Sequence, residues 1–207
     1  MRKKSHLSLA KLLLKNMKMQ DLNEHKKAFY LGSILPDLKP SFITRKHTID
    51  ETFGILLEEI KKVTVKYDVN KGINGYYARH LGVITHYLAD YCTYPHNIEF
   101  SGTFSEHVTY EKELKNMMKE YNHQEAARRD REKQGILHSL EEIERFILKT
   151  HKEYRKALKA VKIDIQYIHY LCHMVLDAIL GFFELAFRLN VGGGRKSERK
   201  LLTDANL

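Results

Sequence analysis

The sequence predicts an all-α protein, folded as a single-domain helical bundle, and three observations support this. Of the 207 residues, 43% are hydrophobic and 10% aromatic, which favours a globular chain with one sizeable core. Only three prolines interrupt the chain, at positions 36, 40 and 95. Beyond residue 47 the apolar residues recur mostly at helical spacing rather than in alternation.

The N-terminal part predicts one helix followed by a loop. Residues 5–18 form an amphipathic pattern, with Ser5 as the expected N-cap and His6 in the opening turn. The segment 31–40 contains two prolines and a glycine. We therefore expect a loop there that leaves Asp37 outside regular structure, in the kind of segment on which binding sites are often built.

The later helices are expected over 48–66, 75–93, 105–121, 136–160 and 164–189. Pro95 ends the helix over 75–93. The charged connection between 121 and 136 predicts a helical continuation with weak packing. Three glycines follow Asn190, so we expect one domain over residues 1–190 and a mobile basic tail over 191–207.

Composition restricts the class of partner without choosing one. The formal charge of +9 favours phosphodiesters, nucleic acid or an acidic membrane surface, although a merely solvated basic surface is the alternative. Two cysteines cannot form a disulfide framework, and the N-terminal residues do not resemble a signal peptide, so we expect none. No window suggests a transmembrane segment. We expect a soluble, cytoplasmic protein, with peripheral binding at the inner membrane face as an alternative; the oligomeric state is unknown from sequence.

Histidines and carboxylates four residues apart are more frequent than chance predicts. With 12 histidines and 26 acidic residues in the chain, random placement gives roughly 1.5 such pairs, and residues at this spacing share one helix face. The sequence contains five of them: His47/Glu51, His86/Asp90, His107/Glu111, His138/Glu142 and His173/Asp177. For any one pair, a local hydrogen bond or a solvated ion pair remains the alternative to a metal site.

Four short segments, taken together in chain order, are more specific than any pair. They are SHLSLAKLL, LPD followed by a histidine, HYLADYCTYPHNIEF and HVTYE. These segments resemble the ligand segments of the zinc-dependent phospholipase C family, whose fold is shared with single-strand-specific zinc nucleases. The resemblance covers residues 5–111 and is weak beyond them.

The resemblance implies a trinuclear zinc site between the helices. The first ion would be held by Asp37, His47, His86 and Asp90. The second would be held by His96, His107 and Glu111. Asp90 would also bridge to a third ion, which would be bound by His6 and by the terminal amine and carbonyl of Met1. This mixture of imidazole nitrogen and carboxylate oxygen suits zinc.

The N-terminus departs from the family pattern. Family members typically expose an N-terminal tryptophan, and this chain contains none. Met1 nevertheless lies five residues before His6, a separation similar to that of the nuclease branch, and bulky Arg2 favours retention of the methionine. The separation of Asp37 and His47 is shorter than is usual in the family, which makes His47 the least secure of the ligands.

Several other residues are given simpler roles. His80, His169 and His173 are expected to be core, surface or hydrogen-bonded residues, and Cys92 a small buried one. Five aromatic residues crowd the same segments as the expected ligands and would either wall a substrate pocket or pack the helices together. They are Tyr87, Tyr91, Tyr94, Phe100 and Tyr110.

The function expected from the resemblance is zinc-dependent hydrolysis of a phosphate ester. A phospholipase C-like phosphodiesterase would attack its substrate with a metal-bound hydroxide, and Asp37 is the candidate for orienting or deprotonating the water. A nuclease, nucleotidase or soluble phosphodiesterase with the same metals is one alternative. A non-catalytic, zinc-stabilised helical module that binds acidic partners is another.

Overall fold

The computed structural model describes residues 1–17, 19–38, 46–123 and 137–191, and within them the chain is helical without a strand, as predicted. The elements are α1 (Lys3–Met17), α2 (Gln20–Glu24), α3 (Lys26–Ile34), η1 (Pro36–Leu38), α5 (Ile49–Val63), η2 (Val69–Lys71), α6 (Gly75–Tyr91), η3 (Tyr94–His96), α7 (Phe104–His123), α8 (Leu140–Lys156) and α9 (Val161–Val191). The elements labelled η are short 3₁₀ helices.

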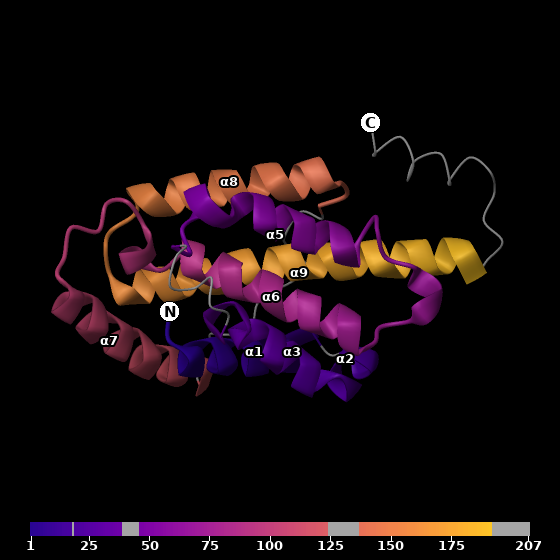
Figure 1. Cartoon of the computed structure of the whole chain (residues 1–207), viewed down its shortest axis with the longest axis horizontal. Coiled ribbons are helices and arrows are strands. Elements are labelled where there is room, and N and C mark those ends of the chain that lie inside the picture. The colour runs from indigo at the N-terminus through magenta and orange to yellow at the C-terminus, as the bar shows by residue number, and fades with distance from the viewer. Residues whose placement is uncertain (18, 39–45, 124–136, 192–207) are drawn as a thin grey trace.

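Helix α6 is the central helix of the bundle. It packs against α3, α5 and α9, while α1 packs on α3 and α7, and α8 packs on α9. Figure 1 shows α5, α6 and α9 running side by side along the long axis, with α1 and α3 beneath them. Almost every residue of α6 from Tyr77 to Tyr91 is buried, including the polar ones. A helix that is buried on all sides must satisfy its polar groups inside the protein.

Two glycines allow α3 and α6 to approach more closely than other residues would. A Cβ atom at Gly32 would lie 2.0 Å from the Arg79 carbonyl oxygen, and one at Gly82 would lie 2.2 Å from the Phe29 carbonyl oxygen. Both distances are impossible for real carbon atoms, so neither position accepts a side chain without a shift of backbone. This packing brings the Ser33 carbonyl oxygen of α3 to 3.0 Å from Nδ1 of His86 on α6.

The N-terminal third differs from the sequence prediction in three ways. Helix α1 begins at Lys3, so Ser5 is a buried residue within it rather than its N-cap. Helices α2 and α3 were not predicted, and residues 31–34 end α3 instead of beginning a loop. Asp37 lies in η1 and is therefore not outside regular structure. The prediction was wrong here because Gly32 serves close helix packing, whereas glycine was taken as a loop signal.

The C-terminal helices agree in number with the prediction and differ in their ends. The predicted helix over 136–160 begins at Leu140, where the Ser139 hydroxyl accepts a hydrogen bond from the Glu142 amide, and it ends at Lys156. Helix α9 continues to Val191. The helical connection predicted before residue 136 lies outside the described residues after His123, as does the predicted tail after 191. The domain boundary at 190 stays a prediction.

Helix α9 corrects the expectation that no segment is long enough to span a membrane. Its stretch Val161–Asn190 is long and apolar enough to cross one, by length and composition alone. Half of the most apolar window, however, is buried inside the bundle. The finding is therefore weak evidence for a membrane span, since a core helix has the same properties.

We predict that Gly82→Ala destabilises the protein by about 2–3 kcal/mol, because the added methyl group overpacks the α3–α6 contact. The matched control is Gly54→Ala in α5, where a Cβ meets no atom within 4 Å. That variant should gain about 0.5–1 kcal/mol from the helix propensity of alanine. Urea unfolding of both variants measures the difference, and equal stabilities would contradict the close-packing argument.

Candidate metal centre

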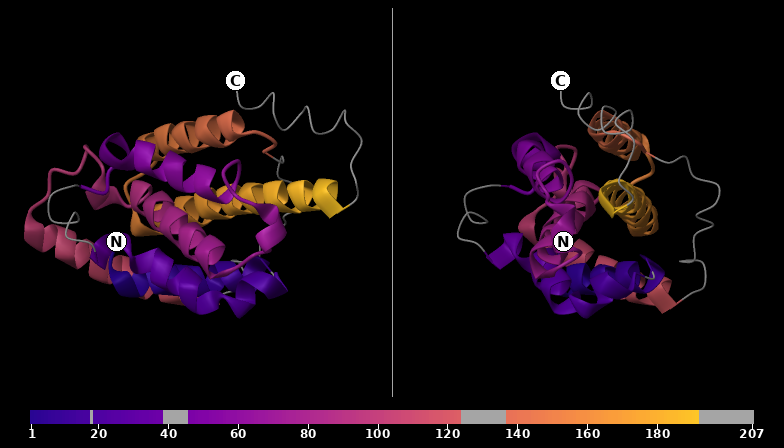
Figure 2. Two further views of the ribbon diagram at one scale, coloured as in Figure 1. Left: turned by 45° about the vertical axis from the view of Figure 1, so that its right-hand side comes forward. Right: turned by 90° about the vertical axis from the view of Figure 1, so that its right-hand side faces the viewer.

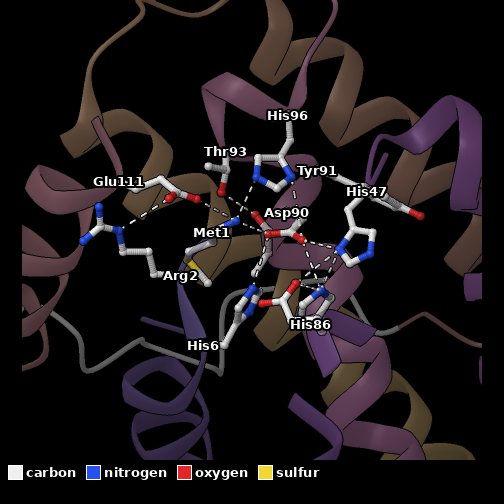
Figure 3. Close-up of polar contacts among 12 residues, drawn as sticks. Met1, Arg2, His6, His47, His86, Asp90, Tyr91, Thr93, His96 and Glu111 are labelled. Carbon is white, nitrogen blue, oxygen red and sulfur yellow. Dashed lines mark hydrogen bonds and ion pairs between the residues drawn. The ribbon is translucent and has the colours of Figure 1, made fainter. Parts of the chain in front are cut away.

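Side chains of the kinds that bind metals converge at one end of α6. Within the described residues, three groups each place their ligand atoms within 4.8 Å of one another. The groups are His6, Asp37 and His86; His47, His86 and Asp90; and His96, His107 and Glu111. Figure 3 shows four of the rings, those of His6, His47, His86 and His96, and the Glu111 carboxylate around the Met1 amino group and Asp90. The structure thus brings all the residues predicted as ligands into one cluster.

Asp90 is the centre of this cluster. It follows His86 by one helical turn on a fully buried face of α6, and its Oδ2 lies 3.2 Å from His86 Nε2 and 3.1 Å from His47 Nδ1. Its other oxygen, Oδ1, lies 2.8 Å from the Met1 amino nitrogen and 3.4 Å from His6 Nε2. The two oxygens of one carboxylate therefore face two different sets of nitrogen atoms.

The hydrogen bond from His86 to Ser33 fixes the tautomer of the His86 ring. The Ser33 carbonyl oxygen only accepts hydrogen bonds, so His86 Nδ1, 3.0 Å away, carries the proton and donates it. The ring then presents the lone pair of Nε2 to the cluster, 2.9 Å from His47 Nδ1 and 3.6 Å from Asp37 Oδ1. A backbone carbonyl that orients the imidazole in this way is typical of metal-binding histidines.

The third group joins η3 to the first turns of α7. Pro95 lies inside η3 and the turn presents His96, whose ring centroid is 5.8 Å from that of His107. His107 and Glu111 are one helical turn apart on α7, with His107 Nε2 3.4 Å from Glu111 Oε1. These three residues lie nearer the surface than Asp90 and the histidines around it.

The N-terminus lies between the groups. The Met1 amino nitrogen is 2.8 Å from His96 Nε2 and 3.5 Å from Glu111 Oε1, in addition to its contact with Asp90. Arg2 holds this end of the chain on α7, because its guanidinium donates to the Val108 carbonyl oxygen at 3.2 Å and lies 3.5 Å from the Glu111 carboxylate.

Burial sets the protonation of the cluster. Burial lowers the pKa of His96 to about 3, helped by the N-terminal ammonium, and burial together with His86 lowers the pKa of His6. Both rings are therefore neutral at pH 7. Burial alone would raise the pKa of Asp90, but the ammonium group and the surrounding histidines hold it well below its usual range. Burial raises the pKa of Asp37.

These residues fit a zinc centre. His6 is fully buried and neither of its ring nitrogens makes a hydrogen bond, although Asp90 Oδ1 lies 3.4 Å from Nε2. Burial of ring nitrogens without hydrogen bonds is costly, and a bound metal ion would offset that cost. The neutral imidazoles present lone pairs, and the carboxylates supply charge. A donor set of imidazole nitrogen and carboxylate oxygen without thiolate is suited to zinc.

The remaining histidines lie elsewhere in the described structure. His80 is hydrogen-bonded to Glu59 on α5, and His151 Nε2 lies 2.8 Å from the Asn97 side-chain oxygen. His173 Nε2 on α9 lies 3.4 Å from the Asn16 amide nitrogen, and His169 packs on Tyr121. These residues contact the helices around them rather than the cluster.

The acidic residues of two other predicted pairs make local contacts, and the aromatic residues are either buried or half-buried. Glu51 and Glu142 accept backbone amides, at 2.9 Å from Lys46 and 2.6 Å from His138, and so act locally. Tyr91 is fully buried with its hydroxyl 3.0 Å from Thr52, and Tyr87 and Cys92 are buried as well. Tyr94, Phe100 and Tyr110 are half-buried and pack edge to face, with the Phe100 ring 5.9 Å from that of His107.

Sequence reasoning missed Asp164, which anchors η3 from the first turn of α9. Its Oδ2 accepts a hydrogen bond from the Tyr94 amide at 2.9 Å, two residues before His96. Its Oδ1 is buried without a hydrogen bond, and burial raises the pKa of this carboxyl to about 7, partly opposed by the Tyr94 amide. In the sequence, an acidic residue at a helix N-terminus is ordinary and gives no such signal.

We predict that Asp164→Asn removes part of the pH dependence of stability. Because the pKa of Asp164 is raised on folding, the wild type loses stability as pH rises from about 4 to about 7, while asparagine keeps the acceptor for Tyr94 and does not ionise. Relative to wild type, the variant should gain about 2–4 kcal/mol between pH 4.5 and pH 8. Urea unfolding across that range tests the slope, and parallel profiles would contradict the assignment.

Comparison with known proteins agrees with this geometry. The model of the family described as zinc dependent phospholipase C matches residues 5–161, which is more than half of the chain. The match extends past the segments recognised in the sequence, through α8 to the first residue of α9. Searches of curated proteins and of solved structures find no match.

Proposed function

Since the chain belongs to the zinc-dependent phospholipase C family, we propose that it hydrolyses a phosphodiester bond of a phospholipid, with zinc bound at the cluster around Asp90. The observation that carries this proposal is the position of the Asp90 carboxylate. Its two oxygens face separate sets of nitrogen atoms that come from α1, α6 and the segment before α5. A carboxylate placed in this way can bridge two metal ions, and paired ions can stabilise both the attacking and the leaving oxygen of a phosphodiester.

The proposed ligand sets are those that the family resemblance implies, and only the set of His96, His107 and Glu111 coincides with one of the three groups. His6, which the structure groups with Asp37 and His86, is assigned to the third ion because its Nε2 also lies 3.4 Å from Asp90 Oδ1. Asp37, His47, His86 and Asp90 would hold one ion. His96, His107 and Glu111 would hold a second. Met1 and His6 would hold a third together with the other oxygen of Asp90. The chain can thus bind up to three zinc ions, with Asp90 shared by two of them.

Bound zinc and Asp37 would have separate roles in the reaction. Bound zinc would lower the pKa of water to about 7 and so supply a nucleophile at neutral pH. Asp37 Oδ1 lies 3.6 Å from His86 Nε2 and 3.7 Å from His47 Nδ1, at the edge of the cluster, where it would orient the attacking water and accept its proton. The raised pKa of Asp37 makes its carboxylate a better base.

We predict that Asp90→Asn lowers turnover at least about 100-fold and lowers bound zinc, because the loss of one bridging oxygen weakens two ion sites. The assay measures phosphocholine release from phosphatidylcholine in mixed micelles, with zinc counted by mass spectrometry on the same samples. Glu59→Gln is the matched control, since it neutralises a buried carboxylate outside the three groups, one that pairs with His80 and Lys62.

The same assay separates the alternatives. Wild-type protein that cleaves single-stranded DNA but not phospholipid would favour the nuclease alternative over the present proposal. Protein that binds at most one zinc ion, with no dependence on Asp90, would contradict a multinuclear centre and favour a structural role for the metal.

We further predict that an extension of two residues before Met1 removes one zinc ion per chain, because it converts the buried terminal amine into an amide with no free lone pair. The same two residues placed after Leu207 serve as the control. Metal content and thermal unfolding are measured on all three proteins. An unchanged zinc count in a folded, extended protein would contradict the assignment of Met1.

A further inference from the structure

The largest exposed apolar side chains of the described structure belong to one end of the molecule. Phe104 is 83% exposed, Ile98 79% and Leu158 77%, more than any other large hydrophobic residue described. An isolated exposed apolar residue is ordinary, but three at one end indicate a contact surface. We name Ile98, Phe104 and Leu158 the apolar rim.

Contacts between the segments show that the chain around Leu158 packs on the chain around Ile98, and Phe104 follows Ile98 by six residues. Ile98 follows η3, Phe104 begins α7 and Leu158 lies in the connection between α8 and α9. Arg155, at the end of α8, pairs with Glu99, and Lys159 Nζ lies 5.7 Å from the centre of the Tyr94 ring. Figure 1 shows these connections at the end of the bundle where α6 finishes, on the left of the view; Figure 2 shows the same arrangement after a turn of the molecule.

The rim adjoins the candidate metal centre. Ile98 lines a shallow surface depression together with His96 and Arg155. Phe104 precedes His107 by about one turn of α7, and the two therefore share a helix face. A surface that covered the rim would consequently cover the approach to His96 and His107.

Basic residues border the rim on the side of Leu158. The end of α8, the following connection and the start of α9 present exposed cations: Lys152, Arg155, Lys156, Lys159 and Lys162. Glu153 is an exposed carboxylate of the same segments, and Glu99 and Glu106 lie beside Ile98 and Phe104, so the carboxylates are fewer than the cations. Exposed apolar side chains bordered by lysine and arginine are the combination that binds the surface of an anionic bilayer.

We propose that the apolar rim docks the protein on a phospholipid bilayer that contains anionic lipid. Ile98, Phe104 and Leu158 enter the boundary between headgroups and acyl chains, and the cations on the side of Leu158 contact lipid phosphates. The three side chains come from separate turns rather than from one helix face, which suits a deformable bilayer better than a complementary protein groove. The inference rests on the proposed function for its substrate, but the docking itself requires no turnover.

The test compares two double variants that change net charge equally. I98D/F104D alters the rim, and V65D/L185D alters apolar residues that are 43% and 51% exposed at the opposite end, beyond α5 and near the end of α9. Co-sedimentation with vesicles of phosphatidylcholine and phosphatidylglycerol (7:3) measures binding. We expect the rim variant, and L158D in a smaller degree, to bind at least tenfold more weakly than the wild type, while V65D/L185D binds like it.

Salt and vesicle composition supply a second readout. Wild-type binding should weaken when phosphatidylglycerol is omitted or when the salt concentration is raised, because charge contributes to docking. If I98D/F104D binds vesicles like the wild type, or if V65D/L185D is the variant that loses binding, the rim is not the docking surface.

Activity measurements separate the failure of docking from the failure of the proposed function. For each variant, turnover of vesicle phospholipid is divided by turnover of a water-soluble phosphodiester, p-nitrophenylphosphorylcholine. A ratio at least tenfold lower in I98D/F104D supports docking. Wild-type protein that hydrolyses neither substrate but still binds vesicles through the rim would overturn the proposed function and leave the docking surface standing.

Discussion

The burial of the Asp90 carboxylate constrains both the fold and the site. Asp90 has no exposed surface and its pKa is held well below the usual range, so it is a buried negative charge. Such a charge is tolerated only when partners surround it. Its partners are the Met1 amine and four histidines, which come from α1, α6, η3 and the segment before α5. The assembly of the site and the packing of these segments on α6 are therefore one event, and a change at Asp90 affects both.

The close packing of α3 on α6 also determines the orientation of the His86 ring. The glycine pair Gly32 and Gly82 brings α3 against α6, and this proximity places the Ser33 carbonyl oxygen on His86 Nδ1. A wider separation of the helices would leave Nδ1 without its acceptor and the ring free to turn. Close backbone packing some distance from the ligand atoms thus selects the tautomer that directs a lone pair at the cluster.

The sequence predicted those parts of the site that depend on helix geometry. The His86/Asp90 and His107/Glu111 pairs are one turn apart in the chain, and their convergence follows from the pitch of a helix. The contact of Met1 with Asp90 and His96 joins residues about ninety positions apart, which no local pattern encodes, and only the family resemblance suggested it. Asp164 was missed for the same reason, because its partner Tyr94 is seventy positions away. Helix α3 was missed because glycine in a packed helix and glycine in a loop look alike in one sequence.

Negative charge is concentrated at the cluster, whereas the chain as a whole is positively charged. The chain carries a formal charge of +9, yet three carboxylates, Asp37, Asp90 and Glu111, face the cluster, where His6 and His96 are held neutral. The interior of the site therefore attracts cations, whereas the surface around it attracts anions. The proposed function needs bound metal ions and an approach to phosphate headgroups, and opposite signs in these two places favour both. A uniformly basic or acidic molecule would satisfy one of the two and oppose the other.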